Sequence, residues 1–221
     1  KIMPEFSKEY FSSLVGQSSN NGFPYNSNEN QLQFIDRLTT VVFDPKVAAK
    51  RVNLDPKVDM VTNSAINFYE GVTQKEAEAF YKDANKDNKK TPVMTGLNTK
   101  LIKENGKIVE KTWKVGGMYT QAIEKIVFWL EKAVTVAENP AQKDALVKLI
   151  AFYKSGSLKD FDNYCVAWVN DTQSAIDVVN GFIEVYNDPM NNKGSFESTV
   201  SVKDMEASKR IKTIGDNAQW F

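Results

Sequence analysis

The stretch NGFIEVYNDPMNNKGSFESTVSV, residues 180–202, predicts a β-hairpin with a long loop. Its first part, residues 181–185, is a short run of strand-forming residues, and Asn187-Asp188-Pro189 interrupts that run with side chains that favour turns. From Ser195 to Val202 apolar and polar residues alternate with the period of two that is typical of a half-buried strand. The rest of the chain is expected to support this hairpin.

Glu184 and Tyr186 lie two positions apart in the first predicted strand. Side chains of a strand alternate between its two faces, so a carboxylate and a phenol are expected to share one surface, with Ile183 and Val185 on the other. Polar residues that alternate on an exposed strand face are usually only solvent-facing. Spacing alone is therefore only weak evidence of a function for this pair.

The composition is that of an ordinary soluble globular chain, with 42% hydrophobic and 25% charged residues. Lys plus Arg and Asp plus Glu number 28 each, so no net charge favours nucleic acid or an anionic membrane surface. The longest apolar stretch, residues 123–136, is interrupted by charged residues, and a membrane helix needs ~20 apolar residues in succession. Composition thus indicates a class of protein and no activity.

The chain has no histidine and a single cysteine, Cys165, which excludes an internal disulfide. A catalytic thiol needs a nearby base or cation to lower its pKa, and no histidine is present to do so. Phe161, Tyr164, Cys165 and Trp168 lie on one predicted helical face, which is typical of a core and not of a ligand cage. A self-contained hydrolase is ranked last because it lacks a nucleophile and base pair.

Most of the remaining chain predicts helices. Helical periodicity and cap signals place them at residues 1–15, 31–43, 55–69, 73–84, 118–138 and 205–218, with two more between 140 and 168 that Gly156 separates. The cap signals include Ser7, a capping box at Thr73–Glu76 and Asp204. Asn105-Gly106 between two strand-like segments predicts a second hairpin. The polar residues 17–30 and 82–90 predict loops. The expected fold class is α+β, mainly helical with a few antiparallel β-hairpins.

Several segments of this chain resemble the dipeptidyl peptidase III family in order and spacing. They are residues 66–71 (INFYEG), 97–101 (LNTKL), 153–158 (YKSGSL), 181–186 (GFIEVY), Asp188-Pro189 and 194–197 (GSFE). The resemblance implies a zinc exopeptidase that removes dipeptides from the N-termini of peptides, built as two lobes around a cleft. It further implies that this chain is part of the β-barrel-containing lobe and that the protein is cytoplasmic.

The family binds zinc through an H-E-x-x-G-H helix and a second glutamate motif, and neither is found in this sequence. A catalytic zinc site needs three protein ligands, usually with imidazole among them. We therefore predict no metal ligand and no cofactor in this chain, and zinc in the full-length parent. The chain is expected to be an inactive fragment whose partner is the missing metal-binding lobe of the same protein.

The resemblance also implies roles for the pair on the first predicted strand. Glu184 would bind the free ammonium of the oligopeptide substrate through charge-assisted hydrogen bonds. Tyr186 is the predicted catalytic residue, whose phenol would donate to the scissile carbonyl oxygen as negative charge develops there. The substrate backbone would also pair along a strand edge, through main-chain hydrogen bonds.

On this basis residues 1–221 are expected to be a single partial domain. It would have a helical N-terminal part at 1–90, a hairpin with long helices at 91–170, and the substrate-site hairpin with a C-terminal helix at 171–221. The alternative is a non-catalytic module that binds a peptide or protein without chemistry. An H-E-x-x-G-H motif in the parent reading frame would favour the peptidase.

Overall fold

The computed structural model describes residues 1–18, 22–84 and 94–221. The chain forms two compact units, residues 1–66 and 67–221, which are described separately below. Most of the predicted loop 82–90 lies outside the described residues. The division of the chain at residues 90 and 170 stays a prediction.

The first unit contains helices α1 (Lys8–Gln17) and α2 (Gln31–Phe43). Ser7 caps α1 by accepting from the amide of Tyr10, as predicted, and Asn30 forms a capping box with Gln33 at the start of α2. The aromatic ring of Phe43 from α2 packs edge-on against the rings of Phe6 and Phe11. Both helices thus begin at local cap signals that the sequence contains.

The predicted helix at residues 55–69 is wrong, because this segment forms turns. The carboxylate of Asp55 accepts from the amide of Lys57, and that of Asp59 accepts from the amide of Thr62. Such short side chains offer the backbone hydrogen bonds that compete with those of a helix. Local side-chain bonding therefore prevails over the proline signal at position 56.

The second unit begins with a mixed three-stranded sheet, in the order β1 (Tyr69–Glu70), β2 (Thr99–Glu104) and β3 (Lys107–Thr112). β1 and β2 are parallel, and β2 and β3 form the predicted antiparallel hairpin. Asn105 and Gly106 both have positive φ, as a tight hairpin turn requires. Helix α3 (Gln74–Ala84) begins at the predicted Thr73–Glu76 capping box and buries Ala77 and Tyr81 against Leu101 of β2.

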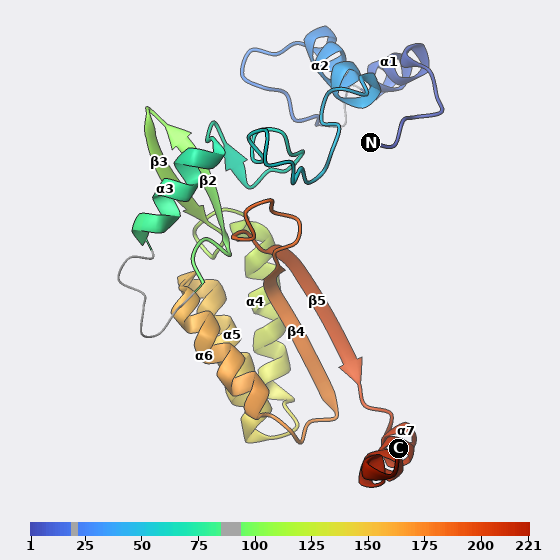
Figure 1. The fold of residues 1–221 in the computed structure, drawn as a ribbon, viewed down its shortest axis with the longest axis vertical. Helices are drawn as coiled ribbons and strands as arrows, with labels where there is room; N and C mark the ends of the chain where they lie inside the picture. The colour runs from blue at the N-terminus through green and yellow to red at the C-terminus, as the bar shows by residue number, and fades with distance from the viewer. Residues whose placement is uncertain (19–21, 85–93) are drawn as a thin grey trace. The chain divides into compact units, whose positions relative to one another are not determined.

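Three helices follow: α4 (Thr120–Thr135), α5 (Pro140–Ser155) and α6 (Leu158–Asn170). Asn139 caps α5 ahead of a first-turn proline, and Gly156 ends it in the left-handed conformation. The hydroxyl of Tyr153 from α5 hydrogen-bonds to Asn180, and that of Tyr164 from α6 donates to the carbonyl of Val178 at 3.2 Å. α5 and α6 are thereby fixed to the strand that follows them (Figure 1).

That strand, β4 (Ile176–Glu184), pairs antiparallel with β5 (Ser195–Val202), and the pairing has a β-bulge between Phe182 and Glu184. The central hairpin predicted from residues 180–202 is therefore confirmed, and β4 starts four residues earlier than that stretch. Helix α7 (Met205–Asp216), capped by Asp204 as predicted, and the short 3-10 helix η1 (Ala218–Trp220) complete the chain.

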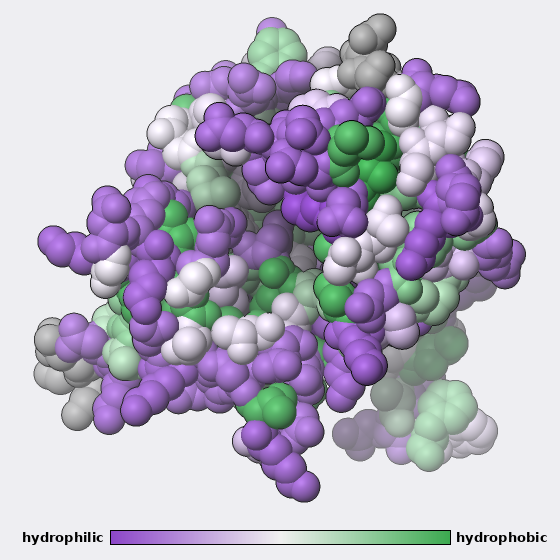
Figure 2. All heavy atoms as spheres, turned by 90° about the horizontal axis from the view of Figure 1, so that it is seen from above, coloured by the Kyte–Doolittle hydropathy of each residue, from purple (hydrophilic) through white to green (hydrophobic). Residues whose placement is uncertain are grey.

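The described residues contain seven α-helices and two small sheets, one mixed and one antiparallel, which confirms the α+β class. Both sheets are open, with three strands and two strands, so the strands of the described residues form no closed barrel. No described helix is both long enough and apolar enough to cross a membrane. On the face drawn in Figure 2 hydrophilic side chains predominate, and hydrophobic ones appear in separate small groups.

Candidate functional site

Glu184 is the last residue of β4 and pairs with Ser195, the first residue of β5. Its side chain is half-buried and makes no hydrogen bond or ion pair with any residue of the described ranges. A carboxylate without a partner can accept hydrogen bonds from a ligand. Within the described residues this carboxylate therefore has no protein partner.

Tyr186 lies in the turn after β4, and 67% of the residue is exposed. Because β4 ends at Glu184, the two-residue period of a strand does not extend to Tyr186. The shared face of Glu184 and Tyr186 thus stays a prediction. The structure does show how the loop that carries Tyr186, residues 185–194, is held in place by hydrogen bonds.

Asp188 organises this loop from inside. Only 1% of the residue is exposed, and its carboxylate accepts from the amides of Met190 (3.1 Å), Asn192 (2.9 Å) and Lys193 (2.8 Å). The hydroxyl of Tyr69 in β1 also donates to Asp188, at 2.8 Å. The sequence predicted a turn residue here, and its role as a buried acceptor for four donors was missed.

Lys193 is another buried polar residue of the loop, and its side chain is fully buried. Its ammonium donates to the hydroxyl of Tyr81 in α3 and to Thr99 Oγ1 in β2 at 2.7 Å, and lies 3.5 Å from Glu110 Oε1 in β3. Burial lowers the pKa of Lys193 to about 8, against the opposing influence of Glu110. No local sequence pattern distinguishes this lysine from an exposed one.

The tyrosines around Lys193 are also held in one protonation state. Burial, with the nearby charge of Glu110, raises the pKa of Tyr81, whose hydroxyl donates to Glu110 Oε1 at 2.7 Å. Burial and the charge of Asp188 raise the pKa of Tyr69. Both shifts favour the neutral phenol, which can donate a hydrogen bond.

Two further contacts fix the ends of the loop. Asn187 Nδ2 donates to Ser195 Oγ at 2.9 Å, and Ser195 is the pairing partner of Glu184. The amide of Gly194 donates to the carbonyl of Leu97 at 2.8 Å, and Leu97 comes just before β2. Asn98 is buried and donates to the carbonyl of Gly156 at 3.0 Å, which joins this region to the end of α5.

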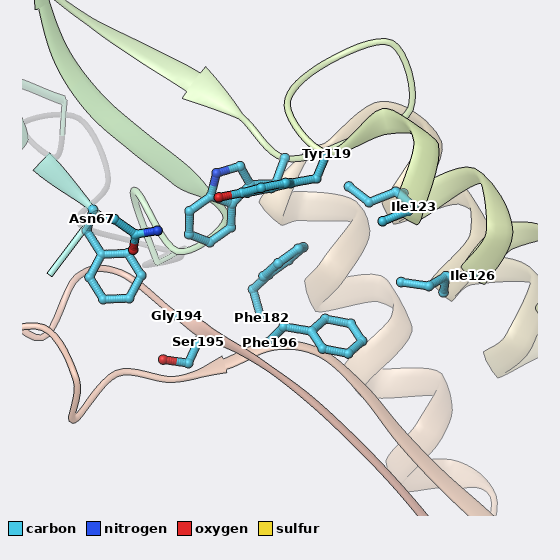
Figure 3. A pocket seen from close by; sticks show the side chains of 11 residues that line it. Asn67, Tyr119, Ile123, Ile126, Phe182, Gly194, Ser195 and Phe196 are labelled. Atoms are coloured by element: carbon cyan, nitrogen blue, oxygen red, sulfur yellow. The ribbon is translucent and has the colours of Figure 1, made fainter. Parts of the chain in front are cut away.

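A pocket of about 360 Å³ is lined in part by Ser195, the residue that pairs with Glu184. Aromatic and aliphatic side chains dominate its lining: Asn67, Phe68, Trp113, Tyr119, Ala122, Ile123, Ile126, Phe182, Gly194, Ser195 and Phe196. In Figure 3, Phe182 and Phe196 from the hairpin lie across from Ile123 and Ile126 of α4. The pocket thus presents a mainly apolar surface that includes Phe182 of β4 and Ser195 of β5.

The described residues contain no group of three or more His, Cys, Asp or Glu side chains that could hold a metal ion. The whole sequence also lacks histidine. A catalytic zinc site of the usual kind therefore does not fit the residues of this chain. The chemistry available here is that of a carboxylate, a phenol and buried hydrogen-bonding groups.

Curated relatives match about half of this chain. The dipeptidyl peptidase 3 of Dictyostelium discoideum is 34% identical over 107 residues, which is 48% of this chain and 16% of that protein. The dipeptidyl peptidase 3 of Homo sapiens is 30% identical over 103 residues, 47% of this chain and 14% of that protein. The aligned segments are thus a small part of each relative.

Solved structures match nearly the whole chain. DPP III from Caldithrix abyssi superposes with a TM-score of 0.56 at 18% identity, over 94% of this chain and 37% of that one. DPP III from Corallococcus sp. strain EGB gives 0.54 at 19% identity, over 94% and 36%. At such identities the likeness shows a shared fold, and the chain spans little more than a third of either structure.

The model of Peptidase family M49 matches residues 23–221, which include every strand and six of the seven α-helices described above. This match covers well over half of the chain and includes Glu184, Tyr186 and the whole loop between β4 and β5. The chain therefore belongs to peptidase family M49.

Proposed function

We propose that this chain is part of the substrate-binding lobe of a zinc-dependent dipeptidyl peptidase that removes dipeptides from the N-termini of peptides. Family membership and relatives named dipeptidyl peptidase 3 support this proposal. The single observation that carries it is the carboxylate of Glu184, half-buried and free of partners among the described residues, at the end of β4. The anchored loop beside it presents Tyr186 to solvent.

Glu184 would distinguish a free N-terminus from an internal peptide bond. A substrate ammonium carries a full charge and three donors, so its hydrogen bonds to a carboxylate are shorter and stronger than those between neutral groups. An internal amide offers neither the charge nor the extra donors. A fixed clamp at this point would set the distance from the N-terminus to the bond that is cleaved.

Tyr186 would stabilise the transition state. Hydrolysis of a peptide bond builds negative charge on the carbonyl oxygen, and a phenol donor aimed at that oxygen binds the charged form better than the ground state. The hydroxyl of Tyr186 makes no hydrogen bond within the described residues, so it is available to a substrate. We place the zinc ligands in the other lobe of the same protein.

The β4–β5 sheet supports a mode of binding for the rest of the oligopeptide. Each of the two strands has one unpaired edge within the described residues. A peptide in the extended conformation can add to such an edge through main-chain hydrogen bonds, which tolerate different sequences. We also propose that the protein is cytoplasmic, as the family resemblance implies.

The test is dipeptide release by the full-length protein that contains residues 1–221. Purified protein is incubated with a hexapeptide and with its N-acetylated form, and products are identified by mass spectrometry. We expect successive loss of dipeptides from the free peptide alone, and loss of activity on chelation of the metal. Binding of the peptide without any cleavage would refute the peptidase and favour the non-catalytic module.

A further inference from the structure

The loop between β4 and β5, residues 185–194, is held chiefly by side chains. It contains turns in place of strand pairing, and both of its fully buried polar side chains face other parts of the second unit. Asp188 folds the loop on itself and binds Tyr69 of β1. Lys193 is the residue that reaches furthest, because its ammonium contacts α3, β2 and β3 together.

The contacts of Lys193 are directional. Its ammonium has oxygen partners on Tyr81, Thr99 and Glu110, and it lies 4.7 Å from the centre of the Tyr81 ring and 5.7 Å from that of Tyr69. Tyr81 and Thr99 also donate to the same oxygen, Glu110 Oε1, at 2.7 and 2.8 Å. Three oxygens and two rings thus define one position for the end of this side chain.

A buried charge of this kind does little for overall stability. The loss of hydration of an ammonium offsets much of the attraction of its partner, and an apolar side chain of similar volume often serves stability as well. What an apolar side chain lacks is direction, because hydrophobic contact does not fix one geometry. A buried ammonium at this position therefore points to a requirement for exact placement of the loop.

We propose that Lys193 is a positioning residue: its ammonium fixes the loop that carries Tyr186 to the β1–β3 sheet, and so sets where the phenol stands relative to Glu184. Lys193 itself touches no substrate, because its side chain is fully buried. The consequence for catalysis rests on the function proposed above, and the placement of the loop does not.

Hydrogen–deuterium exchange of the 221-residue chain tests the placement. In Lys193→Met we expect the backbone amides of residues 190, 192 and 193 to exchange at least about 10-fold faster. Asp188 still accepts hydrogen bonds from these amides, but the loop has lost its anchor to the β1–β3 sheet. Amides of α5 should keep their rates. The matched control is Lys100→Met, which removes a surface ion pair with Glu70 from the same sheet and should leave the loop unchanged.

Glu110→Gln provides a second test of the proposal if Lys193→Met fails to fold. This variant keeps the volume and an acceptor but removes the charge that faces Lys193, and because Glu110 is partly exposed we expect the variant to fold. We expect about 3-fold faster exchange in the loop, a smaller effect than loss of the lysine, because hydrogen bonds to Tyr81 and Thr99 persist. Unchanged loop protection in both variants would overturn the proposal.

Kinetics of the full-length protein test the link to Tyr186. Lys193→Met should lower kcat about 10-fold or more with KM changed less than about 3-fold, because a displaced donor is felt in the transition state. In a Tyr186→Phe background the same substitution should have no further effect on kcat. Additive effects would show that Lys193 acts elsewhere. If the unmodified protein releases no dipeptide, the proposed function fails, and the exchange experiment still decides the placement.

Discussion

The hydroxyl of Tyr69 donates a 2.8 Å hydrogen bond to the carboxylate of Asp188, 119 positions further along the chain. This bond joins β1 to the inside of the loop between β4 and β5, whose own amides bind the same carboxylate. The position of Tyr186 therefore depends on a strand that is distant in sequence.

Tyr69→Phe removes this bond and leaves the buried carboxylate of Asp188 with one donor fewer. We expect the free energy of unfolding of the second unit to fall by about 1–3 kcal/mol, the usual effect of leaving a buried acceptor under-satisfied. Urea unfolding followed by circular dichroism measures this. Tyr186→Phe is the matched control, because its exposed hydroxyl has no partner in the described residues and its loss should leave stability unchanged.

The lowered pKa of Lys193 predicts that the free energy of unfolding rises with pH in the alkaline range. Its pKa is about 8 in the folded chain and 10.5 in an ordinary lysine, so below pH 8 folding must bury a charge, and between these values the unfolded chain binds more protons. The free energy of unfolding should therefore rise with pH above about 8, by about 2 kcal/mol between pH 8 and pH 10. Measurements should stop near pH 10, where unfolded tyrosines begin to ionise. A curve of the same slope in Lys193→Met would contradict this assignment.

Gly194 lies where a side chain has no space. A Cβ at this position would stand 2.7 Å from the backbone carbon and oxygen of Phe182, so Gly194→Ala must displace the loop or the end of β4. We expect the free energy of unfolding, measured by thermal unfolding, to fall by about 1–3 kcal/mol. Gly215→Ala in α7, which meets no atom within 4 Å, is the control and should be neutral or slightly stabilising.

Glu184→Gln keeps the shape of the proposed ammonium clamp and removes its charge. In the full-length protein we expect kcat/KM for peptides with a free N-terminus to fall about 10-fold or more, because hydrogen bonds to charged groups contribute about 1.5–3 kcal/mol. Steady-state kinetics with free and N-acetylated peptides measure the selectivity. Glu5→Gln, outside the matched residues 23–221, is the control. Equal cleavage of free and acetylated peptides by the unmodified protein would refute the role of Glu184 in binding the substrate ammonium.

Tyr186→Phe removes a single hydroxyl. We expect kcat of the full-length protein to fall about 10²-fold or more with a smaller change in KM, since the proposed hydrogen bond strengthens in the transition state. Tyr10→Phe, an exposed tyrosine outside the family match, serves as the control. An unchanged kcat would exclude Tyr186 from the mechanism.

Local signals in the sequence were sufficient for much of the secondary structure. Helix α2, the capping box of Thr73 and Glu76, and the turn at Asn105-Gly106 all appear as predicted. In each case the deciding interactions join residues within a few positions of one another. The error at residues 55–69 arose where two local signals, proline and aspartate, favoured different structures.

The sequence by itself determined the α+β class, the two hairpins and the resemblance that names Glu184 and Tyr186. Only the tertiary structure decided that Asp188 and Lys193 are buried, that β4 ends before Tyr186, and that Phe182 and Ser195 line a pocket. The physical reason is the distance along the chain between partners: Lys193 is 94 positions from Thr99 and 112 from Tyr81. Burial of a charged side chain depends on which distant oxygens the fold brings to it, and no local pattern records them.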